Sequence, residues 1–204
     1  MIKCVIFDVQ GVVASVYDDI EFFQHLSKEG GRPPEYYMTP VFVKLWKDAE
    51  SGKITTEEFV KTVSDLSGLT PEQIDWVGFY RDRLRLNEDV VKLVKQLRRD
   101  YRVVAFTNSD PGRYRATLEV MNPTMFEKIY TSFSIGARKD DPEAFRIVLK
   151  DLGTRPEEVV YIDDRKENLD TAGKLGIRTI LFTNAAALTE SLSVIGVKIK
   201  EKQR

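Results

Sequence analysis

Three apolar segments of the chain each end in polar side chains that could do chemistry. Asp8 follows the first segment, Thr107 and Asn108 follow the second, and Asp163 and Asp164 follow the third. Carboxylate oxygens can bind a hard cation such as Mg²⁺ or act as nucleophiles, and hydroxyl groups can donate hydrogen bonds. One such residue alone would be an ordinary turn or helix cap. Three sets predict one site, because parallel strands present their carboxyl ends at the same edge of a sheet.

The segments that would position these residues have the pattern of buried strands. Short runs rich in β-branched and aromatic residues occupy residues 2–7, 102–106, 158–162 and 178–182. Nearly continuous apolar runs of this length are typical of strands buried on both faces. Helical patterns alternate with them, so the sequence predicts an α/β fold with a doubly wound parallel sheet and right-handed crossovers.

Capping residues mark where several of these helices begin or end. Asn87 can cap a helix that carries apolar residues at helical spacing. Asp141 followed by Pro142 is an N-cap with proline at the first helical position, and Gly153 is a suitable C-terminal stop. These helices are expected to cover the faces of the sheet.

One long stretch interrupts the alternation of strands and helices. Residues 16–86 contain helical signals and no convincing strand, including capping boxes at 55–58 and 70–73. We therefore predict two domains, an α/β core made of residues 1–15 and 87–204, and a helical domain at 16–86 inserted after the first strand.

Composition excludes several classes of protein. The 204 residues are 42% hydrophobic, enough for a sizeable core. Lys and Arg total 31 against 32 Asp and Glu, so no basic excess indicates a nucleic acid partner. No apolar stretch approaches the roughly 20 residues that span a bilayer. A single cysteine, Cys4, and no signal-peptide pattern after Met1 favour a cytoplasmic protein.

Four motifs in this order match a family pattern. They are 7-FDVQGVV-13, 104-VAFTNS-109, 136-GARKDDPEAF-145 and 161-YIDDRKEN-168. With these motifs the chain resembles the haloacid dehalogenase superfamily of aspartyl-nucleophile hydrolases over essentially its whole length. The resemblance implies a Rossmann-like core, and the helical insertion falls where one branch of the superfamily carries a cap domain. Among the members of the superfamily, the sugar-phosphate phosphatases and the phosphatase domain of epoxide hydrolases look most like this chain.

The resemblance also assigns roles to individual residues. Asp8 would attack phosphorus and form an aspartyl-phosphate. Magnesium would be held by Asp8, Asp164 and the Gln10 backbone carbonyl, with Asp163 helping directly or through a water. In the second and third motifs, the residues with catalytic roles would be Thr107, Asn108 and Lys139. Thr107 and Lys139 would donate hydrogen bonds to the phosphoryl oxygens, and Asn168 would orient Lys139 or the metal-binding loop.

Two positions depart from the family pattern. Phosphatases of this family usually carry an aspartate where this chain has Gln10, and that aspartate exchanges protons with the leaving group and with water. An amide cannot do this, and general acid–base catalysis is typically worth about 10²–10⁴-fold in rate. The second departure is Asp140, which replaces the usual proline after Lys139 and is interpreted as a surface variation.

The substrate side of the site is less defined by the sequence. The residues of the insertion that could face the site are Tyr17, His25, Tyr36, Tyr37, Trp46 and Lys47. Aromatic residues at helical spacing are more often core than binding platform, and His25, the single histidine, is expected to pack or to face solvent.

Three functions stay open at this point. A magnesium-dependent phosphatase of a small phosphorylated metabolite is favoured, because only a metal-dependent site needs both Asp163 and Asp164. A 2-haloacid dehalogenase would tolerate Gln10, since chloride leaves without a proton, but that branch usually replaces part of the Asp-Asp motif. A binding or regulatory protein of the same fold would also tolerate Gln10. The sequence does not indicate an oligomeric state.

Overall fold

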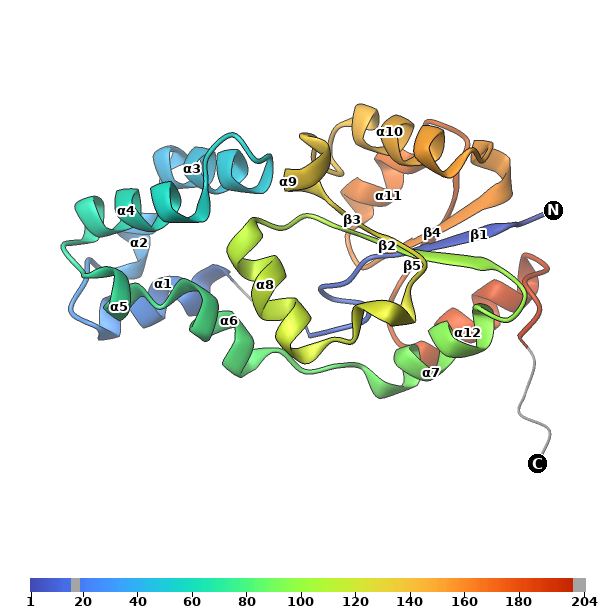
Figure 1. Ribbon diagram of the computed structural model, residues 1–204, viewed down its shortest axis with the longest axis horizontal. Helices are drawn as coiled ribbons and strands as arrows, with labels where there is room; N and C mark the ends of the chain where they lie inside the picture. Colours follow the sequence, from blue (N-terminus) through green and yellow to red (C-terminus); the bar gives the residue numbers. More distant parts are fainter. Residues whose placement is uncertain (16–18, 200–204) are drawn as a thin grey trace.

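The computed structural model of the protein describes residues 1–15 and 19–199. Its centre is a five-stranded sheet in the order β3-β2-β1-β4-β5, with every pair parallel (Figure 1). The strands are β1 (Cys4–Phe7), β2 (Arg102–Thr107), β3 (Ile129–Thr131), β4 (Val159–Asp163) and β5 (Arg178–Leu181). This topology confirms the doubly wound α/β fold that the sequence predicts.

Helices cover both faces of the sheet, and alternate residues of β1 point to opposite faces. Val5 and Phe7 pack in a cluster with α7 (Glu88–Leu97) and α12 (Ala185–Val194). Cys4 and Ile6 pack in a second cluster with α10 (Pro142–Leu152) and α11 (Lys166–Gly173). Burial on both faces explains the continuous apolar run that marks this strand in the sequence.

The helix ends follow the capping residues that the sequence contains. Asn87 accepts a hydrogen bond from the Val90 amide at the start of α7, and Asp141 accepts one from Glu143 at the start of α10. Gly153 ends α10 in the left-handed conformation at φ 60°. Further helices of the core are α8 (Pro111–Val120), α9 (Ser132–Ile135) and the 3₁₀ turns η1 (Pro123–Met125) and η2 (Pro156–Glu158).

The two edge strands differ from the sequence-based expectation. The expected strand at 178–182 forms as β5, but it is not buried on both faces, because it is an edge strand and only its Ile180 is buried. The opposite edge strand, β3, has three residues and was not predicted. So short a segment carries no periodic apolar signal of its own.

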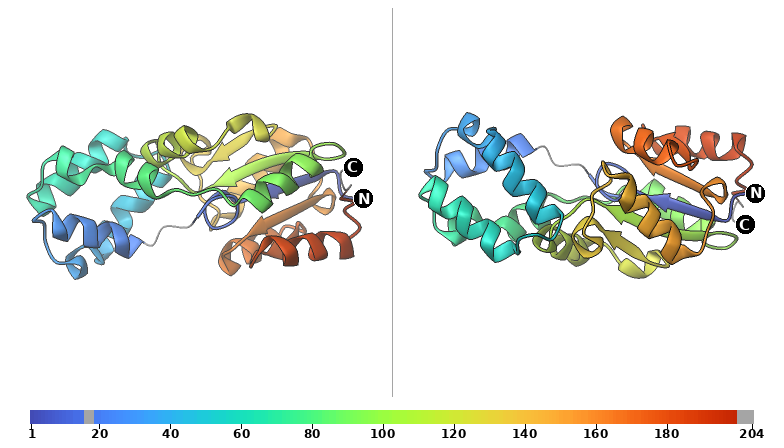
Figure 2. Two further views of the ribbon diagram at one scale, coloured as in Figure 1. Left: turned by 90° about the horizontal axis from the view of Figure 1, so that it is seen from below. Right: turned by 90° about the horizontal axis from the view of Figure 1, so that it is seen from above.

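Residues 19–86 form the helical insertion, which lies beyond the carboxyl ends of the strands (Figures 1 and 2). Its helices are α1 (Asp19–Lys28), α2 (Pro34–Tyr37), α3 (Pro40–Glu50), α4 (Thr56–Ser67), α5 (Pro71–Ile74) and α6 (Trp76–Arg83). Residues 19–85 contain no strand, as predicted. Aromatic side chains, among them Phe22, Phe59 and Trp76, form the insertion's own core. Both predicted capping boxes are present, on Thr55 and Thr70.

The two segments that join the insertion to the sheet run side by side. Ala14 and Leu86 form an antiparallel bridge, and the Asn87 amide donates to the Val13 carbonyl oxygen at 2.9 Å. The chain therefore returns to the core next to the point where it left. None of the helices in the described ranges is both long and apolar enough to cross a membrane.

Candidate active site

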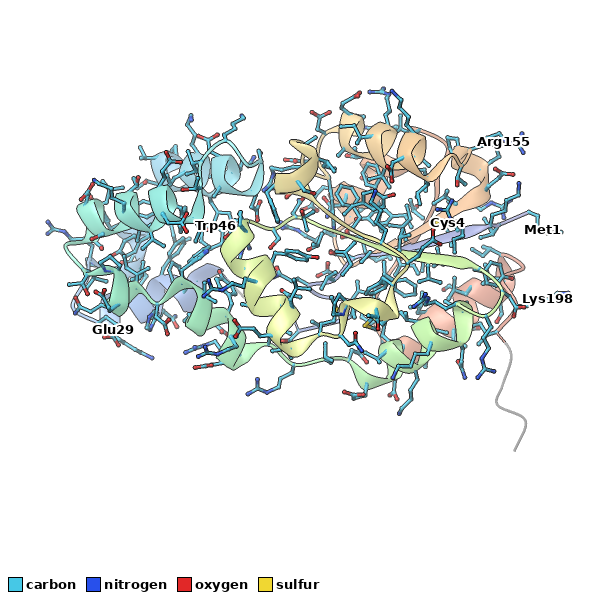
Figure 3. The ribbon with its side chains drawn as sticks, in the orientation of Figure 1. Met1, Cys4, Glu29, Trp46, Arg155 and Lys198 are labelled. Atoms are coloured by element: carbon cyan, nitrogen blue, oxygen red, sulfur yellow. The ribbon has the colours of Figure 1, made fainter. Side chains whose placement is uncertain are left out.

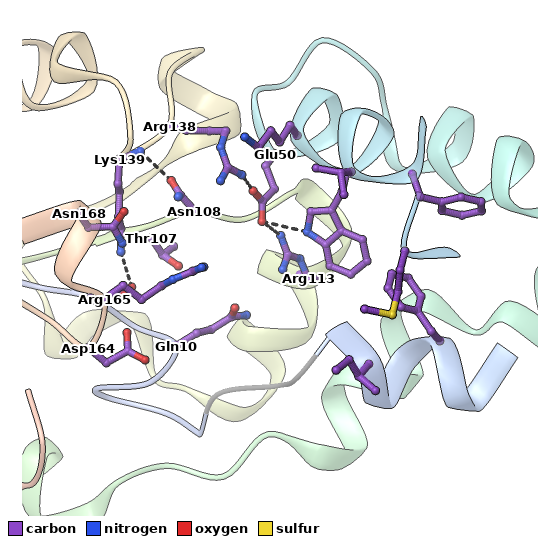
Figure 4. A pocket seen from close by; sticks show the side chains of 18 of the residues that line it. Gln10, Glu50, Thr107, Asn108, Arg113, Arg138, Lys139, Asp164, Arg165 and Asn168 are labelled. Carbon is purple, nitrogen blue, oxygen red and sulfur yellow. Dashed lines mark hydrogen bonds and ion pairs between the residues drawn. The ribbon is translucent and has the colours of Figure 1, made fainter. Parts of the chain in front are cut away.

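The sheet brings the predicted polar residues to one edge. Asp8 directly follows β1, Thr107 is the last residue of β2 and Asp163 is the last residue of β4. Phe7, the last residue of β1, is in register with Ala105 of β2 and Ile162 of β4, so these three neighbouring strands end within two residues of one another. The strand ends open on a cavity of about 490 Å³ between the sheet and the insertion (Figure 4). Predicted residues that line it are Asp8, Gln10, Thr107, Asn108, Lys139, Asp164 and Asn168.

Lys139 joins two of the carboxylates. Its ammonium Nζ lies 2.6 Å from Asp8 Oδ1 and 2.9 Å from Asp163 Oδ2, and its side chain is only 1% exposed. Burial alone would lower the pKa of Lys139, but the charges of Asp8 and Asp163 outweigh burial and raise it. Lys139 is therefore a fixed positive charge at the floor of the cavity.

Asp163 is held by several donors beneath the cavity surface. Besides Lys139, its carboxylate accepts from the Arg165 amide at 2.8 Å, from Asn168 Nδ2 at 3.1 Å and from the Tyr161 hydroxyl. Burial would raise its pKa, but the Lys139 charge and these hydrogen bonds keep it below the ordinary value. Asp163 is thus an ionised group that fixes its neighbours, including Lys139.

Asp8, Asp163 and Asp164 form an acidic cluster with the geometry of a cation site. Each offers a carboxylate oxygen, and these oxygens lie within 4.8 Å of one another. Asp164 Oδ1 is buried, and no residue in the described part of the chain is its hydrogen-bond partner. Buried polar atoms normally have partners, so this oxygen is suited to a bound cation. The donor set, all oxygen, fits Mg²⁺.

The charges of this cluster act on each other. Burial raises the pKa of Asp8 well above its ordinary value, and the negative charge of Asp163 raises it further. The positive charge of Lys139 acts in the opposite direction and lowers it. The pKa of Asp164 is also raised, first by burial and then by Asp163. Gly11 allows this close approach, because it has φ +88° and a Cβ there would lie 2.3 Å from Asp164 Oδ2.

Asn108 and Gln10 complete the edge of the cavity. The Asn108 side-chain oxygen accepts from the Lys139 backbone amide at 3.0 Å, which ties the loop after β2 to the Lys139 loop. Gln10 extends from the loop after β1 into the cavity (Figure 4). It is the second residue after Asp8 in the chain.

A buried charge cluster that the sequence did not indicate lines the cavity where the insertion meets the core. Glu50, the last residue of α3, forms ion pairs with both Arg113 of α8 and Arg138 (Figure 4). Arg113 also pairs with Asp110 at 2.7 Å, and Trp46 Nε1 donates to Glu50 at 3.1 Å. The ion pairs of Glu50 therefore fix the insertion to the core, and the Glu50 side chain is almost completely buried between them.

Asp140 belongs to the exposed rim of this cluster. Its carboxylate lies 3.2 Å from Arg138 and 3.8 Å from Lys47, while 45% of its side chain remains exposed. It therefore adds negative charge between the core and the insertion at the surface of the Lys139 loop.

A family model described as haloacid dehalogenase-like hydrolase matches residues 2–176. The chain belongs to this family of hydrolases. The match includes β1, the insertion, and the strand ends that carry Asp8, Thr107 and Asp163.

Individual relatives agree with this assignment. A D-ribitol-5-phosphate phosphatase from Bacteroides thetaiotaomicron is 30% identical, over 96% of this chain and 98% of that protein. A sesquiterpene phosphatase from Aspergillus oryzae is 26% identical, over 91% and 92%. Among solved structures, a family enzyme from Bacteroides thetaiotaomicron in complex with magnesium and inorganic phosphate superposes with a TM-score of 0.80. It is 25% identical, and the match covers 90% of this chain and 96% of that one.

The substrate-side residues predicted for this hydrolase divide into two groups. Tyr37, Trp46 and Lys47 line the cavity. Tyr36 is exposed and does not line it, and His25 packs against the Phe79 ring with centroids 5.1 Å apart. Tyr17 lies outside the described residues.

The sequence carries little signal for the charged residues of the site that were not predicted from it. Arg138 stands next to Lys139 inside a motif, so its position near the site was implied without a role. Glu50 and Arg113 are single charged residues on separate helices, and only the fold brings them together.

Proposed function

We propose that this hydrolase is a magnesium-dependent phosphatase of a small phosphorylated metabolite, with Asp8 as its nucleophile. The observation that carries the proposal is the placement of Lys139, 2.6 Å from Asp8 in a buried site that also contains Asp163 and Asp164. This arrangement combines a nucleophilic carboxylate, a fixed cation and an acidic cluster, which are the parts that phosphoryl transfer requires.

Asp8, Asp164 and the Gln10 backbone carbonyl would hold the magnesium ion. The buried Asp164 oxygen, which has no hydrogen-bond partner among residues 1–15 and 19–199, supports this role. The hydrogen bonds that occupy Asp163 favour an indirect role for that residue. When bound, the ion would offset the repulsion between Asp8 and an anionic phosphoryl group. The relative solved with magnesium and inorganic phosphate supports the same assignment.

The reaction would proceed in two displacements at phosphorus. A carboxylate oxygen of Asp8 forms a bond to phosphorus while the bond to the ester oxygen breaks, which leaves an aspartyl-phosphate on Asp8. Water then attacks phosphorus, releases inorganic phosphate and regenerates the carboxylate. Lys139 and Thr107 donate hydrogen bonds to the phosphoryl oxygens, where negative charge is spread. Asn108 holds the Lys139 loop through the Lys139 amide.

Gln10 limits the proton-transfer part of this mechanism. An amide cannot protonate the departing oxygen or activate water, so a proton from solvent must serve. General acid–base catalysis contributes about 10²–10⁴-fold, which corresponds to roughly 3–5 kcal/mol of barrier. Turnover should therefore be slowest for esters whose alcohol is a poor leaving group.

Gln10 also favours a second candidate, a binding or regulatory protein that keeps the fold with little turnover. The two functions make different predictions for a panel of phosphate monoesters assayed with Mg²⁺ and with excess chelator. The phosphatase proposal predicts turnover of at least an aryl phosphate that depends on Mg²⁺. Absence of such turnover, together with binding of beryllofluoride as an aspartyl-phosphate mimic, would favour the second candidate.

The dehalogenase alternative has less support. Asp163 and Asp164 are both retained and both take part in the acidic cluster. Two solved 2-haloacid dehalogenase structures that resemble this chain are 18% and 16% identical to it, and this likeness concerns the fold alone.

A further inference from the structure

The two ends of the cavity differ in chemistry. The end at the sheet is formed by the charged and amide groups around Asp8 and Lys139. The end at the insertion is mainly apolar, and the apolar residues that line it are Ile20, Phe23, Met38, Phe42, Val43 and Trp46. The charged residues Glu50, Arg113 and Arg138 line the cavity between these two ends (Figure 4). A phosphoryl group at Asp8 would therefore direct its leaving group past these charges toward the apolar wall.

Three residues of the apolar wall are exposed to the cavity rather than packed in the core. Ile20, Met38 and Val43 are 40%, 57% and 50% exposed. Large apolar side chains that remain exposed within a concave site are typical of a ligand-binding surface. They would lose their contact with water when a substrate is bound.

Trp46 gives the wall a rigid aromatic part. Its Nε1 donates to Glu50, the Arg113 guanidinium lies 5.0 Å from its ring centroid, and its ring meets that of Trp76 edge to face at 4.9 Å. With its position fixed in this way, the indole would lose little freedom when a flat apolar group binds beside it.

Two of the polar groups on this wall are already engaged with partners in the protein. In the described part of the insertion, the polar residues that line the cavity are Tyr37, Lys47 and Glu50. The Tyr37 hydroxyl accepts from the Arg32 amide at 2.9 Å, and Glu50 is paired with two arginines. Lys47 lies 3.8 Å from Asp140. The hydroxyls of a polyol would find few partners here, and unpaired polar groups weaken binding.

Gln10 independently favours the same kind of substrate. Without an acid beside Asp8, the departing oxygen develops negative charge before solvent can protonate it, and a phenolate carries this charge far better than an alkoxide. From the apolar wall and Gln10 together, we infer that the substrate is a phosphate monoester of an apolar alcohol, best a phenol, and that Val43 and Met38 help select it. This inference rests on the proposed phosphatase function and specifies its substrate class.

Calorimetry with two non-hydrolysable phosphonates tests this inference without requiring turnover. In the presence of Mg²⁺, 1-naphthylmethylphosphonate should bind wild-type protein more tightly than 2,3-dihydroxypropylphosphonate, by about tenfold or more, because only the first buries the apolar wall. Equal binding of the two, or tighter binding of the dihydroxy compound, would overturn the inference.

Matched variants on α3 locate the effect. Val43→Thr keeps the side-chain shape but places a hydroxyl in the wall, and it should weaken naphthyl binding by about three- to tenfold. Val41→Thr is the control, since Val41 is 64% exposed on the same helix and does not line the cavity. Identical affinities of the two variants for the naphthyl probe would contradict the assignment of the wall.

The same protein samples separate this inference from the proposed function. If no phosphate ester is hydrolysed but the naphthyl preference and its loss in Val43→Thr are found, the phosphatase function fails and the ligand class stands. If aryl and polyol phosphates are hydrolysed with equal kcat/KM and the calorimetry shows no preference, the function stands and the substrate class fails.

Discussion

Glu50 forms an ion pair with Arg138, the residue that immediately precedes Lys139. Glu50 ends α3 of the insertion, whereas Lys139 contacts the proposed nucleophile Asp8. A buried charge pair keeps its two elements in register, because each charge would be costly to leave without a partner. The position of the insertion and the position of the Lys139 loop are therefore linked.

Glu50→Gln should weaken this link. The amide leaves Arg113 and Arg138 with less compensating charge in a buried site, although Asp110 and Asp140 remain as partners. We expect the free energy of unfolding to fall by about 2–3 kcal/mol. We also expect kcat/KM for an aryl phosphate to fall, since the cavity walls are no longer held in place.

Urea unfolding and steady-state kinetics check this expectation. Glu57→Gln is the matched control, because Glu57 is exposed in the first turn of α4. Its effect on stability should stay within about 0.5 kcal/mol. Equal stability of Glu50→Gln and Glu57→Gln would show that the buried pair does not fix the insertion.

Tyr161→Phe should impair catalysis while the aromatic ring stays in place. The Tyr161 hydroxyl donates to Asp163, and the ring is fully buried between β4 and α10. Loss of a hydrogen bond to a charged group costs about 1.5–3 kcal/mol. Because Asp163 positions Lys139, kcat should fall while KM changes little.

A second tyrosine separates positioning from simple destabilisation. Tyr130 donates in the same way to Asp151, a carboxylate outside the cavity lining. Tyr130→Phe should also reduce stability in thermal unfolding, but its kcat should match that of wild type. If both variants lower kcat equally, the hydroxyl of Tyr161 has no specific role in the site.

Gln10→Asp should restore a proton donor beside Asp8. We expect a gain in kcat of up to about 10²-fold for alkyl phosphates and a smaller gain for aryl phosphates, because only poor leaving groups need the proton. Gln10→Asn is the matched control, since the asparagine side chain has the same length as that of aspartate but carries no acid. Equal rates for the two variants across a leaving-group series would argue against a missing acid.

The strand ends of the active site could be predicted because their signal is local. The apolar runs of β1, β2 and β4 are continuous in the sequence, and each is followed directly by its polar residue. Parallel pairing then brings Asp8, Thr107 and Asp163 together without any further information. The caps at Asn87, Thr55 and Thr70 are equally local.

The substrate side could not be predicted in the same way. Glu50 and Arg113 are far apart in the sequence and neither has a spacing that marks it, while Arg138 lies in a motif that gives it no role. Aromatic residues of the insertion share one helical pattern whether they are core, as Phe59 is, or line the cavity, as Trp46 does. Which of them line the cavity depends on how the insertion packs against the sheet.

The single cysteine offers a control for the folding of every variant. Cys4 lies in the core of β1 (Figure 3), and burial raises the pKa of its thiol to about 12. At pH 8 the thiol is therefore neutral and inaccessible, so iodoacetamide should label it only when the core opens. Mass spectrometry of labelled protein, with and without urea, measures this. Rapid labelling of the native protein would show that the core around β1 opens readily.

Hydrolysis of 4-nitrophenyl phosphate by wild type and by Asp8→Asn, each with Mg²⁺ and with chelator, tests the central claim most directly. The substitution keeps the shape of the side chain and removes the nucleophilic carboxylate. We predict turnover by wild type that requires Mg²⁺ and a loss of more than about 10³-fold in Asp8→Asn. The result that would contradict Asp8 as the nucleophile is wild-type turnover by Asp8→Asn. Protection of Cys4 from iodoacetamide would confirm that this variant is folded.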